Sequence, residues 1–296
     1  MEVAAKISGN NFVGVNKRMN RIKMKMRKMV LGAALMAAAA VGGEEYVSIS
    51  GRVTDYRGEP VDSCAVCVSN PDFSTAYEAM TDADGFYRID SVARGSYANV
   101  CAMRPEEYPR QKAVKPEDMK LEFWAWNVIA DKDLTLDLRY DKLELYGTTA
   151  FCEYGGRPDM LIYTRPMSVT KVLSYEDYMD KAAYEKHSKV TVEPEYMEFE
   201  VYVDGKKYDI ISVQHLSLPN TNGNPVNDDC YLLQVPMPED VHYRKDGNYE
   251  VRVVGHNTQY DEWGESVCYL RPFDYRWGEA KKITGRRIGT VGLATD

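Results

Sequence analysis

The sequence predicts a mainly β protein built from two antiparallel β-sandwich domains, with one short helix in the second. Short runs of alternating apolar and polar residues follow one another closely along the chain. Turn-forming pairs such as Arg57-Gly58, Asp84-Gly85 and Asp204-Gly205 separate these runs. The chain holds 22 tyrosines, and aromatic residues favour strands. Its 296 residues accommodate about two domains of roughly 100–200 residues each.

Residues 1–43 are predicted to be a leader outside the fold. Five basic residues lie within 21–28, and the apolar run Met29–Val41 follows them. This order is typical of a secretory signal peptide, and the run is shorter than the about 20 residues of a membrane span. An amphipathic helix or short anchor is the alternative, and Met19 could be the true start. The mature chain is therefore expected to be periplasmic or secreted, with no transmembrane segment.

The charge of the chain argues against two classes of partner. The net charge is −8, but the chain without residues 1–43 has 29 basic and 44 acidic residues, a net of −15. Such an acidic protein repels phosphate backbones and anionic membrane surfaces. Nucleic-acid binding is therefore not expected.

The first domain is expected to span residues 46–146. Its strands are predicted at about 47–53, 61–69, 77–81, 86–89, 97–103 and 134–139. Residues 104–133 look like an insertion before the last of these strands. The Asp82-Ala-Asp-Gly85 stretch could suggest a calcium loop, but the further oxygen ligands and the late Glu of such a loop are missing. It is therefore interpreted as a hairpin turn.

Four segments carry a family resemblance. They are G-R-V-T-D-Y-R-G-E-P-V, A-V-x-V, T-D-A-D-G-F-Y and R-G-S-Y, all within Ser48–Val100. Together they resemble the carboxypeptidase regulatory-like domain, which we assign to residues 47–145. The resemblance implies a small transthyretin-like β-sandwich without catalytic activity. Such domains are appended to peptidases, to surface proteins and to TonB-dependent transporters, and this chain is too short to add a transporter barrel.

Six cysteines are present, two of them in a C-x-x-C at Cys64 and Cys67. On a strand, residues three apart point to opposite faces, so these sulfurs are not expected to share a metal or a disulfide. Cys64 is predicted to be a small core residue. Cys230 and Cys268 fall in strands expected to be neighbours, and they are the first pair to test for a disulfide.

The second domain is expected over 147–275, immunoglobulin-like or similar, with a loose tail at 276–296. A helix is predicted over Leu173–Ser188, with Ser174 as its cap. Asp204-Gly205 predicts a two-residue hairpin turn, after which Lys206–Val213 pairs back on the preceding strand. No family is recognised in this half.

Four aromatic residues are candidate ligand-binding residues: Trp124, Trp126, Tyr260 and Trp263. Trp124 and Trp126 share one strand face and could stack on sugar rings, cover the inserted segment or pack against the second domain. Tyr260 and Trp263, with Tyr275 and Trp277, could form an aromatic platform or pack in the core or between the domains. The Asn220–Asp229 loop offers oxygens for Ca²⁺, but turn-formers in a solvated loop account for it equally, and no metal is predicted.

Motifs for catalysis are absent from the sequence. None of the four histidines has a Glu three residues later, and no H-E-x-x-H, G-x-S-x-G, P-loop or dinucleotide fingerprint occurs. We therefore predict no enzyme activity and no cofactor. The expected function is that of an exported cell-envelope binding or scaffolding module, with an envelope protein or a glycan as partner. The alternatives are a glycan- or peptide-binding accessory protein and an uncharacterised hydrolase.

Overall fold

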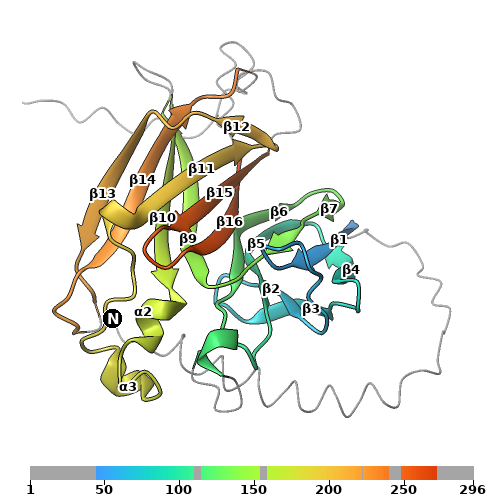
Figure 1. Ribbon diagram of the computed structural model, residues 1–296. Coiled ribbons are helices and arrows are strands. Elements are labelled where there is room, and N and C mark those ends of the chain that lie inside the picture. Colours follow the sequence, from blue (N-terminus) through green and yellow to red (C-terminus); the bar gives the residue numbers. More distant parts are fainter. Residues whose placement is uncertain (1–44, 110–114, 154–158, 222, 240–247, 272–296) are drawn as a thin grey trace, which may run out of the picture.

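The computed structural model describes residues 45–109, 115–153, 159–221, 223–239 and 248–271 (Figure 1). The chain is mainly β, as predicted, and its described strands form three sheets. The leader expected at 1–43 and the tail expected at 276–296 lie outside the described residues, as do Tyr275 and Trp277.

The first sheet is small and contains the N-terminal strand. Its strands are β1 (Tyr46–Thr54), β4 (Phe86–Ala93), β7 (Leu134–Thr135) and β8 (Leu138–Arg139). β4 pairs antiparallel with β1, while β7 and β8 both pair parallel with β1. The short strands β7 and β8 together extend along the same edge of β1, so this sheet is three strands wide.

The second sheet has eight strands in the order β12-β11-β15-β16-β6-β5-β2-β3. Their bounds are β2 Ala65–Ser69, β3 Thr75–Met80, β5 Gly95–Met103, β6 Phe123–Ala130, β11 Met197–Val203, β12 Lys206–Tyr208, β15 Tyr249–Asn257 and β16 Glu262–Leu270. Parallel pairing of β16 with β6 joins its two halves, and Ser266 lies opposite Trp124 there. The Ser266 hydroxyl donates a hydrogen bond of 2.8 Å to the Trp124 carbonyl oxygen. One sheet therefore runs continuously from the N-terminal to the C-terminal part of the chain.

The third sheet has the order β13-β14-β10-β9. Its strands are β9 (Leu143–Glu153), β10 (Asp159–Ser168), β13 (Ser212–Leu218) and β14 (Asp228–Pro236). Two short α-helices, α2 (Val169–Leu173) and α3 (Lys181–Tyr184), follow β10, and two 3₁₀ turns lie at Pro116–Asp118 and Pro194–Tyr196.

The two small sheets pack on opposite faces of the eight-stranded sheet, and each encloses its own core. Strand β16 shows this most directly, because successive side chains point to opposite faces of a strand. Val267 and Tyr269 join the first core, with Ile49 of β1 and Phe123 of β6. Cys268 joins the second core. Both sandwiches therefore share the eight-stranded sheet as one of their layers.

Three local expectations need correction. The prediction of one helix over Leu173–Ser188 is wrong. Helix α2 ends at Leu173, where the Ser174 hydroxyl donates a hydrogen bond to the Lys171 carbonyl oxygen. A new helix, α3, then begins, and the Asp180 carboxylate caps it by accepting hydrogen bonds from the backbone N–H groups of residues 182 and 183. Residues 206–213 do not all pair back, since only β12 pairs with β11 and β13 joins the third sheet. The segment 104–133 is not only an insertion, because it contributes β6 to the interior of the large sheet.

Several other expectations are confirmed. Asp204 and Gly205 both have positive φ, the conformation of a type I′ hairpin turn between β11 and β12. The Asp82 carboxylate accepts hydrogen bonds from the backbone N–H groups of Asp84 and Phe86, so this stretch is a turn between β3 and β4. Cys64 is buried in the first core, as predicted.

Within the described residues, no helix has the length and apolar character to cross a membrane.

Candidate functional site

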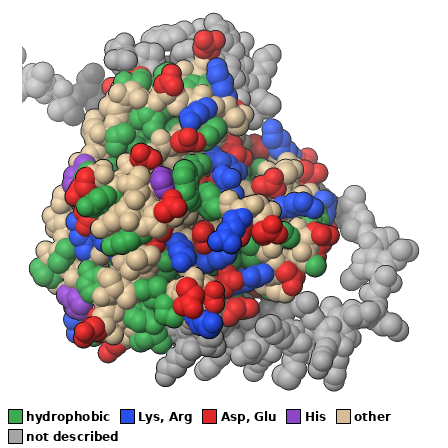
Figure 2. All heavy atoms as spheres, viewed as in Figure 1, with side chains coloured by type: hydrophobic (Ala, Val, Ile, Leu, Met, Phe, Trp, Pro, Cys, Tyr) green, Lys and Arg blue, Asp and Glu red, His purple; other side chains and the backbone are tan. Residues whose placement is uncertain are grey.

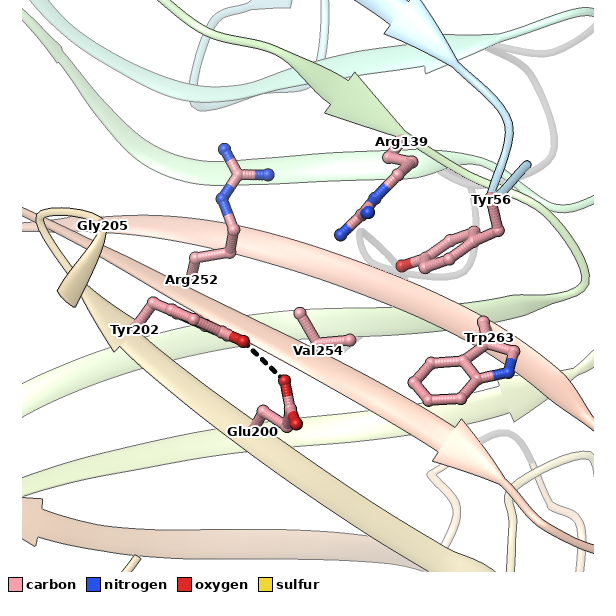
Figure 3. A pocket seen from close by; sticks show the side chains of 8 residues that line it. All are labelled: Tyr56, Arg139, Glu200, Tyr202, Gly205, Arg252, Val254 and Trp263. Atoms are coloured by element: carbon pink, nitrogen blue, oxygen red, sulfur yellow. Dashed lines mark hydrogen bonds between the residues drawn. The ribbon is translucent and has the colours of Figure 1, made fainter. Parts of the chain in front are cut away.

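A groove lies where the first sandwich meets the C-terminal half of the large sheet. Its volume is about 590 Å³, within the range typical of small-molecule sites. Its lining residues are Tyr56, Arg139, Glu200, Tyr202, Gly205, Arg252, Val254 and Trp263 (Figure 3). The floor comes from β11, β15 and β16, and one wall comes from β8 and the turn that follows β1. The groove therefore depends on both halves of the chain.

Strand alternation explains why these side chains meet. In β15, Val251 and Val253 point into the second core, so Arg252 and Val254 point to the other face. The same alternation in β11 turns Glu200 and Tyr202 to that face. The third sheet covers only the opposite face. The other face of the C-terminal half of the large sheet, which is polar, therefore lines the groove.

A buried carboxylate organises the basic residues of the groove. The Glu265 side chain is only 1% exposed and accepts hydrogen bonds from two arginines. Arg139 donates from Nη2 at 2.6 Å and from Nε at 3.2 Å, both to Oε2. Arg252 donates from Nη1 to Oε1 at 2.5 Å. Burial alone would lower the pKa of Arg252, but Glu265 and Glu250 outweigh that effect and raise it. Both guanidinium groups are therefore held charged and in fixed positions.

The Tyr56 hydroxyl is the one lining group that is buried without a partner among the described residues. Its ring lies 4.6 Å from the Arg139 guanidinium carbon and 6.3 Å, between ring centres, from Trp263. Figure 3 shows the hydroxyl directed into the groove toward Arg139. Burial, and then the charge of Glu265, raise the pKa of Tyr56 well above its usual value. The phenol is therefore protonated and can both donate and accept a hydrogen bond.

Glu200 is the acceptor on the opposite side of the groove. It accepts hydrogen bonds of 2.6 Å from the Tyr202 hydroxyl and from Lys207. The hydrogen bond from Lys207, followed by that from Tyr202, lowers the pKa of Glu200. This carboxylate is ionised at neutral pH and is unsuited to act as a general acid there.

Trp263 provides a fixed aromatic surface. Its ring stacks on His256 at 4.0 Å between centres, with an angle of 11° between the planes. His256 is itself positioned by Asp261 at 2.9 Å and by Glu198 at 3.2 Å. The indole is 37% exposed and lines the groove. One ring face is thus held by protein while the side chain stays open to a ligand.

The other three aromatic candidates lie elsewhere. Tyr260 is 40% exposed in the turn between β15 and β16 and does not line the groove. Trp124 and Trp126 stack on each other at 5.0 Å, and both make edge contacts with Tyr146 of β9. Trp124 is only 9% exposed. This pair packs between β6 and β9, so its rings are engaged by protein.

Sequence reasoning missed most of the groove. Tyr56 was interpreted only as part of a turn, and Arg139 only as the end of a strand. One local signal was available: Glu250 and Arg252 alternate with buried valines in β15, which marks the second face of that strand as polar. Nothing local indicates that Arg139 would meet Glu265, because 126 positions separate them.

Comparison with known families identifies the N-terminal part of the chain. Residues 48–109 match the carboxypeptidase regulatory-like domain. The match runs from β1 through β5 and confirms the resemblance inferred from the sequence. No curated protein matches the chain.

Solved structures resemble the chain only distantly. The major pilin subunit BcpA of Bacillus cereus is 11% identical over 76% of this chain and 69% of that chain, with a TM-score of 0.24. The major pilin SpaD of Corynebacterium diphtheriae is 10% identical over 78% and 66%, with a TM-score of 0.24. A DUF3823 family protein of Parabacteroides merdae is 11% identical over 77% and 100%, with a TM-score of 0.22. Likenesses this weak carry no argument about function.

Proposed function

We propose that this protein is an exported, non-catalytic cell-envelope binding module that takes its ligand in the groove between the two sandwiches. The buried Tyr56 hydroxyl carries the proposal. It is directed into a cavity beside two fixed arginines and a fixed tryptophan, and it has no partner among the described residues. Buried polar groups are normally hydrogen-bonded, so this geometry suits a ligand that supplies the missing partner.

Two further observations support the absence of catalysis. The matched domain resembles a family of non-catalytic modules. In the groove, the Glu265 carboxylate is engaged by two arginines, and the lowered pKa of Glu200 makes that carboxyl unsuited to hold a proton for an acid-catalysed step at neutral pH. The hydrolase alternative is therefore the less favoured one.

Cosedimentation with insoluble cell-envelope material tests the proposal. Purified protein lacking residues 1–43 should bind that material, and Trp263→Ala and Arg139→Ala should each reduce the bound fraction at least fivefold. Tyr260→Ala is the matched control, because this neighbouring aromatic residue is exposed but does not line the groove. Equal binding by all three variants would rule out the groove as the binding site.

Export is tested separately. Residues 1–43 fused to a reporter enzyme that is active only outside the cytoplasm should give activity, and replacing the basic residues Arg27 and Lys28 by Glu should reduce it. A reporter that stays inactive with the intact leader would contradict the envelope location.

A second candidate function is protein docking at strand β13. This is an edge strand of the third sheet. Val213 and Leu218 expose apolar side chains along it, and Ile211 exposes another just before it begins. Exposed edge strands can accept a strand from another chain. If a partner docks there, Val213→Lys should abolish its capture from envelope extracts while groove variants retain it.

A further inference from the structure

The chemistry of the groove indicates which chemical class of ligand it binds. This inference rests on the proposed function of the groove as a binding site. Three features bear on it: the way the floor is built, the balance of charge, and the placement of the aromatic rings.

The centre of the groove floor, strand β15, offers side chains rather than free backbone groups. Strand β15 pairs with β16 along its whole length and with β11 from Val251 to Asn257, so Arg252 and Val254 lie within both pairings. Its backbone N–H and C=O groups are therefore used within the sheet. An extended peptide binds most readily by adding a strand to a free edge, and β15 has no free edge at Arg252 or Val254. The site is thus better suited to a ligand recognised through side chains.

The charges around the groove cancel. Arg139 and Arg252 share Glu265, Arg252 also contacts Glu250 at 3.3 Å, and Lys207 pairs with Glu200. These three cations and three anions sum to zero. Figure 2 shows basic and acidic side chains interspersed on this side of the molecule, without a broad area of one sign. A phosphate or a polyanion would need uncompensated positive charge, whereas a neutral ligand with many hydroxyls can use ion-paired donors and acceptors alike.

The aromatic rings complete the pattern. Trp263 is held on His256, and the Tyr56 ring lies beside Trp263, with 6.3 Å between ring centres, and against Arg139. Rings of this kind present an apolar face together with a polar tip. A sugar ring has the complementary character, with C–H groups on its faces and hydroxyls around its rim.

We propose that the groove binds a neutral oligosaccharide. The C–H face of one sugar ring packs on Trp263, and sugar hydroxyls pair with the Tyr56 hydroxyl, with Arg139 and with Glu200. Glu265 acts as a positioning residue because it accepts the hydrogen bonds that hold Arg139, and Arg252 in turn fixes Glu265.

An array of neutral gluco-, manno- and galacto-oligosaccharides, uronic-acid and sulfated glycans, and unstructured peptides tests this assignment. A neutral oligosaccharide should bind, and titration calorimetry at 50 mM and 500 mM salt should give dissociation constants within twofold of each other. Tyr56→Phe, which removes only the hydroxyl, should weaken binding about fivefold, and Trp263→Ala should weaken it more than tenfold. Tyr260→Ala should bind as the unmodified protein does.

The other outcomes separate the ligand class from the groove itself. Binding only to acidic glycans, with strong salt dependence, or only to peptides, would overturn the assignment of a neutral oligosaccharide. If Trp263→Ala still abolished that binding, the groove would nevertheless remain the binding site. A complete absence of glycan binding would overturn the assignment as well. Glycan binding that is unchanged in both Tyr56→Phe and Trp263→Ala would place the saccharide outside the groove. Thermal unfolding of each variant is the control that tests whether the fold is retained.

Discussion

Arg252 and Glu265 form a diagonal ion pair between neighbouring strands at the base of the groove. Arg252 lies directly opposite Val267 in the β15–β16 register, and Glu265 is two residues from that position on the same face. The arginine Nη1 and the carboxylate Oε1 are 2.5 Å apart. The Glu265 side chain is almost fully buried, so loss of this pair should destabilise the large sheet. Because Arg252 also lines the groove, the same loss should change the shape of the groove.

Replacing Arg252 should be costly. Arg252→Met should lower the free energy of unfolding by about 3 kcal/mol, because it leaves a buried carboxylate with only one of its two guanidinium partners. Arg139→Met should cost less, about 1 kcal/mol, because the Arg139 side chain is 41% exposed and water already solvates it. Urea unfolding followed by tryptophan fluorescence measures both. An Arg252→Met protein as stable as the parent would show that the pair contributes nothing to the fold.

A glycine next to this pair sets the distance between two sheets. A Cβ added at Gly264 would overlap the carbonyl oxygen of Leu143 in β9. Gly264→Ala should therefore force β9 and β16 apart and cost about 3 kcal/mol of unfolding free energy. Gly95→Ala is the control, since an added Cβ there meets nothing within 4 Å, and its effect should be within about 0.5 kcal/mol. Equal effects of the two substitutions would contradict the close packing of β9 on β16.

The first sandwich could be predicted from sequence because its signals are local. Its early strands are separated by short turns such as Asp82–Gly85, and each strand is short and alternating. The parallel pairing of β16 with β6 leaves no such signal, because Ser266 and Trp124 are 142 positions apart. The large shared sheet therefore became evident only in the structure.

The division of the chain illustrates the same limit. The boundary expected between residues 146 and 147 falls inside β9, and β6 of the first part pairs with β16 of the second. Two domains at 46–146 and 147–275 remain a prediction, which limited proteolysis can test. Of the four aromatic candidates, only Trp263 lines the groove, because composition indicates which residues can bind but not which of them pack inside.

Two buried glutamates should make stability depend on pH. Burial raises the pKa of Glu144 to about 8, and burial followed by the charge of Glu144 raises the pKa of Glu122. The folded state then holds protons that the unfolded chain releases above its ordinary pKa of about 4.3. The stabilisation that these groups contribute is present at low pH and is lost as pH rises from about 5 to about 8. Over that range, the free energy of unfolding falls by up to about 1.4 kcal/mol per pH unit for each proton that the folded state retains.

Glu144→Gln tests this pH dependence. The variant should show a flatter decline of unfolding free energy than the parent between pH 5.5 and 8.5, because the amide does not titrate. Urea unfolding at three pH values within that range gives the two slopes. Identical slopes would show that Glu144 does not hold its proton in the folded state.

The cysteines should be protected in the folded protein. Burial raises the pKa of Cys64, Cys67 and Cys268 to about 12 each. Only the thiolate is alkylated, and an unperturbed thiol has a pKa of about 8.5, so labelling at pH 8 should be roughly a thousandfold slower at these sites in the native protein than in urea. Mass spectrometry of peptides labelled with iodoacetamide measures each site, and fast native labelling of Cys268 would mean that the second core opens readily.

The same experiment decides the redox state of the cysteines. All six cysteines lie among the described residues and none forms a disulfide there, and Cys230 and Cys268, the pair first considered for a disulfide, lie in different sheets. Labelling in urea without reductant should therefore modify six residues. Cys67 and Cys101 lie directly opposite each other on β2 and β5, which makes them the most informative control. Four labelled residues, with these two missing, would show that this pair is oxidised to a disulfide, which would link β2 and β5 covalently within the shared sheet.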